Sequence, residues 1–290
     1  MTIGDPSEGR YVDVGDTRLW VLELGHGHPI VLLHGGPGLD HTQFRPWLDP
    51  LAERFRLLYV DQRSQGRSDV ADPRTWTLRR LAQDVSELAG ALGLDSYAVL
   101  GQSFGSFVAL QHAVDHGAAS HYVLLGCVPG SRWLDRIESN LSATEPPELR
   151  DRIAASWDME SQVQTVQELR RLLADQLPFH FADADGEPYR AFLANVERHM
   201  RLSPDVLREF AVTDAAAIDV EDRLQDIDRP VLVIAAEHDR VTVPEGGWAI
   251  AEAVPRGECV LIKNAGHMAF VEKPGAVIRA IGDFFDRFPP

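Results

Sequence analysis

One serine of this chain lies in a turn that suits nucleophilic chemistry. Residues 101–105 read Gly-Gln-Ser-Phe-Gly, after a predicted strand at 97–101 and before a predicted helix over about 106–116. A serine in a tight strand-to-helix turn is exposed at the end of the sheet, beside the N–H groups of the helix N-terminus. Such a serine can also be an ordinary helix cap. The two glycines favour Ser103 as a nucleophile, because they let neighbouring backbone approach it closely.

A serine hydroxyl needs a general base and an acid that orients the base. In a parallel α/β sheet these groups follow the carboxyl ends of later strands. Asp239 follows the apolar stretch that begins at Pro230, and His267 follows the stretch that begins at Cys259. Taken singly, Asp239 could be a turn cap and His267 a loop residue. Their order after Ser103 is the order of a serine, acid and histidine triad, so we predict that triad.

Residues 34–38, His-Gly-Gly-Pro-Gly, follow an apolar run and contain three glycines, which have no side chain. Attack on an acyl carbon leaves negative charge on its oxygen, and fixed N–H donors stabilise that charge by ~2.7–4 kcal/mol each. One donor is expected at Phe104, after the nucleophile, and the second in this loop. We assign the second donor to Gly36 and substrate binding to Gly35. His34 is interpreted as a structural or lining group.

The elements that must position these residues alternate along the chain. A hairpin is expected around Gly15, and Thr77 is expected to cap a helix. The continuous apolar runs are typical of strands buried on both faces, which predicts a mostly parallel sheet with helices on both sides. The predicted strands are 29–35, 55–61, 97–101, 121–127, 229–239 and 258–267, and the predicted helices are 42–55, 77–93, 106–116, 248–255 and 274–288.

The stretch 129–228 is helical, charged and without a buried-strand run. We therefore expect a doubly wound α/β core, formed by residues 1–128 and 229–290, that is interrupted by a helical cap over 129–228. Six aromatic residues of this cap could line an apolar pocket or fill its core. They are Trp133, Trp157, Phe179, Phe181, Tyr189 and Phe192.

Composition limits the partners of the chain. Its 290 residues carry 44 acidic against 28 basic side chains, a formal net charge of −16. This argues against nucleic acid or an anionic membrane as partner and favours a cationic ligand. No apolar stretch approaches the roughly 20 residues of a membrane span, and no signal peptide is evident, so a cytoplasmic protein with free cysteines is expected. His112 and His116 have the spacing of a zinc pair but no third ligand, so neither metal nor cofactor is predicted.

Five segments together resemble a known family. They read HGGPG at 34–38, DQRSQGRS at 61–68, GQSFGS at 101–106, EHDRVTVP at 237–244 and AGHMAF at 265–270. The chain resembles an α/β-hydrolase, and more narrowly the proline iminopeptidase family of serine aminopeptidases. It departs from the family pattern at Ser64, where a glycine is usual, at Phe104, where Trp or Tyr is frequent, and at Arg240, where some relatives carry glutamate.

The resemblance implies a hydrolase that releases an N-terminal aminoacyl residue from a short peptide or small amide with a free amine. It also implies that the cap is a lid whose carboxylates bind the substrate's ammonium, because a buried ammonium must be paired. Glu197 and Glu209 are the candidates from sequence. The alternative is that both are solvated helix charges.

Two other functions are compatible with the sequence. A carboxylesterase or lactonase for a neutral acyl group would use the same triad. A non-catalytic ligand-binding protein on the same scaffold is the remote alternative. The sequence carries no signal for an oligomeric state.

Overall fold

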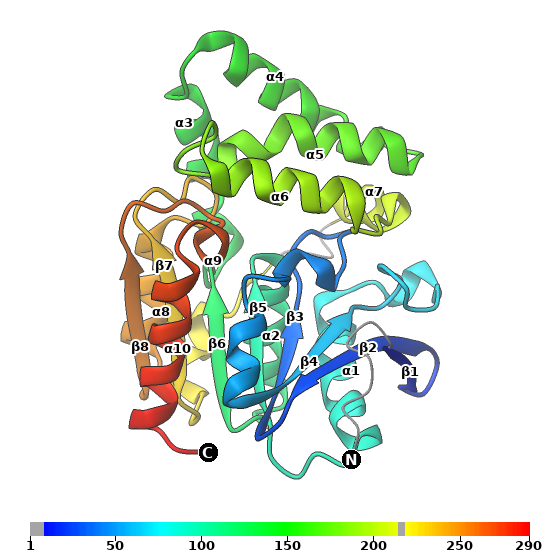
Figure 1. Ribbon diagram of the computed structural model, residues 1–290, viewed down its shortest axis with the longest axis vertical. Helices are drawn as coiled ribbons and strands as arrows, with labels where there is room; N and C mark the ends of the chain where they lie inside the picture. The colour runs from blue at the N-terminus through cyan, green and yellow to red at the C-terminus, as the bar shows by residue number, and fades with distance from the viewer. Residues whose placement is uncertain (1–8, 214–217) are drawn as a thin grey trace.

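The computed structural model describes residues 9–213 and 218–290. An eight-stranded sheet with the strand order β1-β2-β4-β3-β5-β6-β7-β8 lies at its centre (Figure 1). The strands are β1 (Arg10–Asp13), β2 (Arg18–Gly25), β3 (His28–Leu33), β4 (Phe55–Asp61), β5 (Ala98–Gln102), β6 (His121–Leu125), β7 (Val231–Ala236) and β8 (Gly257–Ile262).

Strand direction within the sheet follows the expected pattern. β2 runs antiparallel to both of its neighbours, β1 and β4, and the hairpin around Gly15 is present. From β4 to β8 all neighbouring strands are parallel. The predicted mostly parallel α/β sheet is confirmed. Its carboxyl edge brings together the loops after β3, β5, β7 and β8, which carry the candidate site residues.

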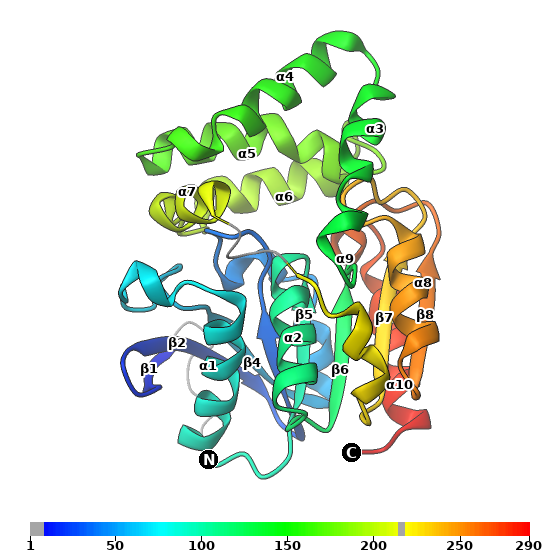
Figure 2. The same ribbon diagram turned by 180° about the vertical axis from the view of Figure 1, so that it is seen from behind.

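Helices cover both faces of the sheet. α1, α2 and α8 lie on one face, seen in front in Figure 2, and α10 lies on the other, seen in front in Figure 1. Each face of the sheet has its own hydrophobic core, and successive side chains of a strand point into opposite cores. Leu32 packs on the α10 side and Val31 on the α1 side. Thr77 caps α1 as expected, because its side chain accepts from the Arg80 N–H. These core helices are α1 (Leu78–Ala91), α2 (Phe104–Asp115), α8 (Pro244–Ala253), α9 (Ala269–Glu272) and α10 (Pro274–Arg287).

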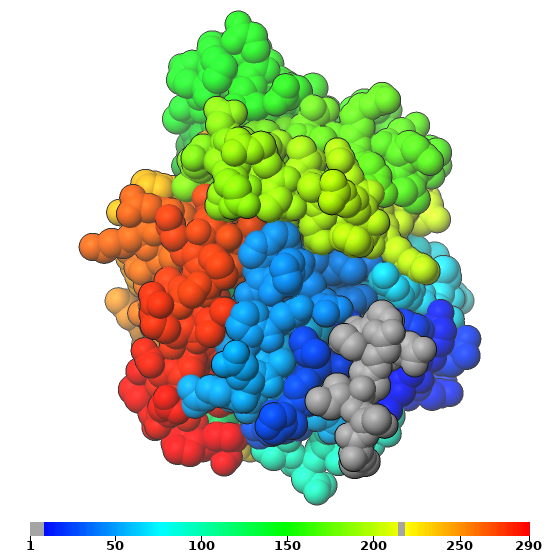
Figure 3. Space-filling view, viewed as in Figure 1, coloured from blue at the N-terminus to red at the C-terminus, as the bar shows by residue number. Residues whose placement is uncertain are grey.

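Between β6 and β7 the described residues form five further α-helices, and we call them the cap. They stack above the carboxyl ends of the parallel strands, and in the space-filling view they rest directly on the core (Figures 1 and 3). Asn195 of α6 joins the two parts, since its side-chain amide donates to the Thr42 backbone oxygen over 2.8 Å. The cap helices are α3 (Arg136–Ser142), α4 (Pro147–Asp158), α5 (Val166–His180), α6 (Glu187–Arg198) and α7 (Pro204–Val212). The proposed cap limits at 129 and 228 stay predictions.

The expected helix over 42–55 is wrong. That stretch forms two short 3₁₀ helices, η1 and η2, because Pro46 and Pro50 cannot donate the hydrogen bonds of a continuous helix. The 3₁₀ helices are η1 (His41–Phe44), η2 (Asp49–Glu53), η3 (Pro73–Thr75), η4 (Ser131–Trp133), η5 (Glu160–Gln162) and η7 (Glu221–Asp226).

Both cysteines are free, as expected, with Cys127 buried and Cys259 half-buried. Among the helices of residues 9–213 and 218–290, none combines the length and the apolar character that a membrane span needs.

Candidate active site

Ser103 occupies a strained turn at the carboxyl end of β5. Its backbone has φ 51° and ψ −119°, a positive φ that L-residues rarely adopt. The turn is fixed because the Ser103 N–H donates to the Leu125 oxygen over 2.9 Å. Gly105 makes the turn possible, since a Cβ on it would lie 2.0 Å from the Leu33 oxygen of β3. The geometry pushes the serine side chain out over the end of the sheet.

Asp239 and His267 meet above the ends of β7 and β8. His267 Nδ1 donates to Asp239 Oδ2 over 2.8 Å, and the Thr242 hydroxyl donates to the same oxygen over 2.8 Å. Two backbone N–H groups, of Val241 and Thr242, donate to the other carboxylate oxygen. Every oxygen of this buried acid is therefore satisfied, and the His267 ring is held in one orientation.

The charge state of Asp239 follows from these contacts. Burial alone would raise its pKa, but the charge of His267 and the hydrogen bonds from His267 and Thr242 outweigh burial. The pKa of Asp239 therefore lies below its usual range, and the acid is ionised at neutral pH. An ionised Asp239 holds the proton of His267 on Nδ1 and leaves the lone pair on Nε2.

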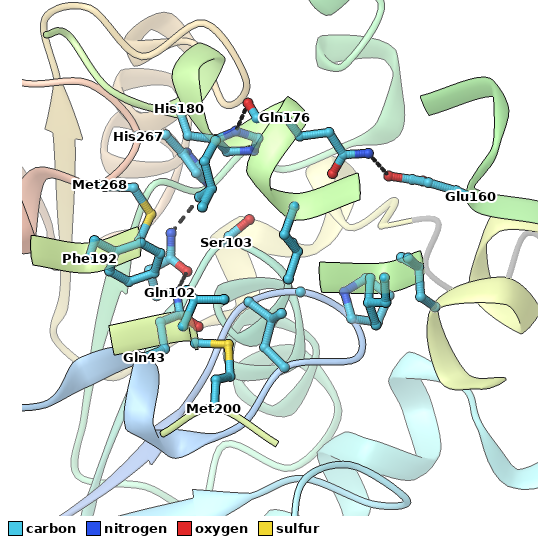
Figure 4. Close-up of a pocket in the computed structure, with 18 of the residues that line it drawn as sticks. Gln43, Gln102, Ser103, Glu160, Gln176, His180, Phe192, Met200, His267 and Met268 are labelled. Carbon is cyan, nitrogen blue, oxygen red and sulfur yellow. Dashed lines mark hydrogen bonds between the residues drawn. The ribbon is translucent and has the colours of Figure 1, made fainter. Parts of the chain in front are cut away.

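The third predicted member, Ser103, lines the same cavity as His267 (Figure 4). Within the described chain its hydroxyl makes no hydrogen bond, and His267 Nε2 instead accepts from the Gln102 side chain over 3.2 Å. The serine and the histidine are thus brought together without the direct bond. Such bonds are often absent until substrate is bound.

The backbone N–H groups of the loop after β3 differ in whether they are already bonded. The Gly35 N–H donates to Gln43 Oε1 over 2.8 Å, and the Gly38 N–H donates to Gln65 Oε1 over 2.6 Å. Pro37 has no N–H. Gly36 lines the cavity at φ 116°, and its N–H has no partner among the described residues. Gly36 therefore stays the candidate oxyanion donor, whereas the Gly35 N–H is already bonded and Gly35 is buried.

The second candidate donor is the Phe104 N–H. It is the first N–H of α2 and has no acceptor within the helix. Phe104 itself is anchored, because its ring packs edge-on against Phe210 of the cap with centroids 5.0 Å apart. The two candidate donors thus come from the loop after β3 and from the first residue of α2.

The cavity between core and cap holds about 190 Å³, below the roughly 300–1,000 Å³ of common ligand pockets. Its wall is largely apolar and comes mostly from the cap. Glu160 is the one lining side chain of the described residues with a formal charge. The lining is Gly36, Pro37, Leu39, Gln43, Gln102, Ser103, Trp157, Glu160, Leu169, Leu173, Gln176, Leu177, His180, Phe192, Val196, Met200, Leu207, His267 and Met268.

The two carboxylates chosen from sequence are not in this lining. Glu197 is exposed on α6 and Glu209 is half-buried on α7. The carboxylate that lines the cavity is that of Glu160, in the short helix η5 after α4. Sequence patterns do not single it out, because it lies outside any amphipathic repeat. Of the six cap aromatics, Trp157 and Phe192 reach the cavity.

Glu160 is held by the cap rather than by the core. Gln176 Nε2 donates to Glu160 Oε1 over 2.8 Å, and no described residue donates to the second carboxylate oxygen (Figure 4). Burial raises the pKa of Glu160, and the Gln176 hydrogen bond opposes that rise. A cation next to this carboxylate would stabilise its charged form.

His180, at the end of α5, was not foreseen from sequence. Its ring lies edge-on against His267, with centroids 5.4 Å apart, and its Nδ1 donates to the Gln176 backbone oxygen over 3.0 Å. Burial and the neighbouring His267 lower the pKa of His180 to about 4. It is therefore a neutral side chain that offers its Nε2 lone pair to the cavity at neutral pH.

Arg240, the residue after Asp239, attaches the cap to the core. Its guanidinium donates to the Pro178 and Phe181 oxygens over 3.2 and 2.6 Å and lies 5.0 Å from the centre of the Phe179 ring. The neighbouring His180 oxygen accepts from the Met268 N–H. Arg240 thus fixes the end of α5.

One cluster has the composition of a metal site. Asp40, His41 and Asp61 are buried, and each offers one potential ligand atom within 4.8 Å of those of the other two. Their donors are already paired, since Arg67 bonds to both carboxylates and His41 Nδ1 bonds to Asp61 over 2.6 Å. The Arg67 guanidinium supplies the positive charge that this acidic cluster needs, so the geometry gives no reason to assign a metal.

Comparison with known proteins agrees with this architecture. A family model described as the alpha/beta hydrolase fold matches residues 28–274. A proline iminopeptidase of Xanthomonas citri is 28% identical over 89% of this chain and 90% of that protein. A probable proline iminopeptidase of Leptolyngbya boryana is 27% identical over 91% and 87%.

Solved structures superimpose over nearly the whole chain. The proline iminopeptidase of Mycobacterium smegmatis has a TM-score of 0.76 at 24% identity, covering 97% of this chain and 98% of that one. An esterase of Exiguobacterium antarcticum also has a TM-score of 0.76, at 21% identity, covering 96% and 100%. At these identities the structures show the fold alone. Together with the family match, they show that the chain belongs to the α/β hydrolase family and is similar to proline iminopeptidases.

Proposed function

We propose that this protein is a serine hydrolase that releases an N-terminal aminoacyl residue from a short peptide or small amide. Ser103 Oγ attacks the acyl carbon while His267 Nε2 takes the hydroxyl proton. The Gly36 and Phe104 N–H groups stabilise the oxyanion. The tetrahedral intermediate then collapses, and His267 gives its proton to the leaving amine. Water then attacks the acyl-enzyme while His267 takes its proton, the bond between the acyl carbon and Ser103 Oγ breaks, and His267 returns the proton to Ser103 Oγ as the amino acid leaves.

One observation carries the proposal: Glu160 lies in the same cavity as Ser103 and His267, on a wall that is otherwise uncharged. A carboxylate with a free oxygen in an apolar cavity is suited to an ammonium group, which supplies both the charge and the missing donors. The net charge of −16 favours the approach of such a cation.

The size and surface of the cavity indicate which acyl groups fit. A volume of about 190 Å³ suits a small acyl group rather than a long peptide or acyl chain, so in this proposal the leaving group lies outside the cavity. Leu169, Leu173 and Phe192 offer an apolar surface for a small aliphatic or ring side chain. Proline, alanine and similar residues are therefore the expected N-terminal residues, in agreement with the named relatives.

The proposal is tested with arylamides of proline, alanine and glycine, each with a free and with an acetylated amine. The wild-type enzyme is expected to cleave the free amines and to lose at least about 100-fold in kcat/KM on acetylation, since acetylation removes the charge that pairs with Glu160. Ser103→Ala is expected to abolish turnover of every substrate. Full turnover by Ser103→Ala would exclude the mechanism.

A second function, a carboxylesterase or lactonase for neutral acyl groups, is favoured by the apolar wall and by the raised pKa of Glu160. A protonated Glu160 would accept an uncharged acyl group. Equal rates on free and acetylated substrates, with faster turnover of the matched aryl esters, would support that function. A protein that binds ligand without turnover would leave Ser103 unreactive toward a fluorophosphonate probe.

A further inference from the structure

A line of buried side-chain amides connects the loop after β3 to the candidate base. The Gly35 N–H donates to Gln43 Oε1 over 2.8 Å, and Gln43 Nε2 donates to Gln102 Oε1 over 2.6 Å. Gln102 Nε2 then lies 3.2 Å from His267 Nε2 (Figure 4). Gln43 and Gln102 are only 2% and 1% exposed, so water does not compete for these bonds.

The direction of every bond in this line is fixed from its two ends. A backbone N–H can only donate, so Gln43 must present its oxygen to Gly35 and its NH₂ to Gln102. Gln102 then presents its oxygen to Gln43 and its NH₂ to His267. At the other end, Asp239 accepts the Nδ1 proton of His267, which leaves a lone pair on Nε2. The two ends require the same amide orientations, so no assignment in the line is arbitrary.

The line ends on the atom that the Ser103 proton must reach. We propose that Gln102, oriented by Gln43, is a positioning residue for the base: it occupies the Nε2 lone pair of His267 in the free enzyme and yields it to the Ser103 hydroxyl when substrate fills the cavity. This inference rests on the proposed serine mechanism. It also explains why, among the described residues, the Ser103 hydroxyl has no hydrogen-bond partner: Gln102 is bonded to the nitrogen that would accept from it.

The Gln102 bond favours the neutral imidazole. A protonated His267 would direct an Nε2–H at the NH₂ of Gln102, and two donors would face each other. In the free enzyme the Gln102 NH₂ therefore meets the lone pair of a neutral His267 Nε2. The titratable groups that face His267 are Asp239, on Nδ1, and His180, against the ring, while Glu160 lies in the same cavity. A change at Gln102 leaves all three in place.

Gly35 belongs to the same arrangement. A Cβ on Gly35 would lie 2.2 Å from Gln102 Oε1 and 3.1 Å from Gln43 Nε2. Neither amide can move away without breaking a bond of the line. Position 35 therefore requires glycine, because the two side-chain amides occupy the space that a Cβ would need.

The test compares Gln102→Met, which cannot donate, with Gln102→Glu, which still accepts from Gln43 but places a carboxylate at His267. The rate at which a fluorophosphonate labels Ser103 is followed against pH. The acid-side midpoint of this profile is expected to rise by about 0.5–1 pH unit in Gln102→Met, and further in Gln102→Glu. Gln111→Met is the matched control, because Gln111 lies on α2 and bonds to Asp115 instead. It is expected to keep the wild-type midpoint.

A second readout does not depend on the reaction. In ¹⁵N NMR spectra at pH 8, the Nε2 resonance of His267 is expected to move toward that of an unbonded nitrogen in Gln102→Met but not in Gln111→Met. Unchanged profiles together with an unchanged Nε2 resonance would overturn the inference. If Ser103 of the wild-type enzyme is never labelled, the serine mechanism fails instead, and the NMR comparison still decides the role of Gln102.

Discussion

The backbone N–H of Gly35 and the carboxylate of Asp239 terminate one line of hydrogen bonds that runs through Gln43, Gln102 and His267. Gly35 adjoins Gly36, the candidate oxyanion donor, and Asp239 orients the candidate base. The loop that would hold the oxyanion and the loops that would hold the base are therefore parts of one buried network. A disturbance at either end is expected to be felt at His267.

Gly35→Ala should reproduce the loss of the Gln102 bond without a change of the glutamine. The added Cβ would displace the amide, which we expect to cost ~1–3 kcal/mol of unfolding free energy and to raise the acid-side midpoint of Ser103 labelling. Gly90→Ala is the control, because no atom lies within 4 Å of a Cβ placed on Gly90 in α1. It should stabilise the protein by ~0.5–1 kcal/mol. A Gly35→Ala variant with the wild-type profile would contradict the account.

His180 should make the protein acid-sensitive. Its pKa of about 4 in the folded state lies below the value of ~6.5 in the unfolded chain. The unfolded state therefore binds more protons between these values, and stability falls as the pH drops from about 6.5 to about 4. His180→Gln removes this term, so the stability lost between pH 7 and pH 5 should shrink by ~2 kcal/mol in urea unfolding.

The control for this pH effect is His199→Gln, since His199 is an exposed histidine of the cap region. It should lose as much stability as the wild-type protein between pH 7 and pH 5. Equal losses in His180→Gln and wild type would show that His180 is not held neutral by its surroundings.

Arg240→Met should loosen the cap. The variant loses two charge-assisted bonds to the end of α5, at a cost of ~1–3 kcal/mol in unfolding free energy. Hydrogen exchange should quicken at the Ala182 and Met268 amides, which bond across the same junction. Arg79→Met, on an exposed arginine whose nearest carboxylate is 3.9 Å away, should leave both readouts unchanged. Unaltered exchange in Arg240→Met would mean that other contacts hold the cap.

Most of the fold could be predicted from sequence, because a parallel sheet buried on both faces leaves a strong local signal. The runs around Ile30 and Val233 read as strands without knowledge of their neighbours, and their order implies the sheet. The stretch 42–55 departs from the expected continuous helix, because Pro46 and Pro50 lack the N–H donors that such a helix needs.

The residues of the candidate site also fall into those that the sequence could predict and those that it could not. Ser103, Asp239 and His267 could be proposed from sequence because each follows a recognisable strand, and strand ends converge. Glu160 could not, because which cap carboxylate faces inward depends on how η5 packs against α5. The role of Gln102 also escapes a sequence reading, since it requires Gln43, 59 residues earlier, to fix the amide.

The central claim is that Glu160 recognises the substrate's amine beside Ser103. Its most direct test is the ratio of kcat/KM for a free prolyl or alanyl arylamide to that for the N-acetylated form, compared between wild type and Glu160→Gln. The substitution removes the charge but preserves the shape and the Gln176 neighbour. Glu197→Gln is the matched control, because Glu197 is exposed and outside the cavity.

The ratio is expected to fall by about 30-fold or more in Glu160→Gln, because one member of a buried charge pair is lost, while Glu197→Gln keeps the wild-type ratio. The loss should come from the free amine alone, with the acetylated substrate unaffected. A wild-type ratio in Glu160→Gln, or an equal loss in Glu197→Gln, would contradict the claim.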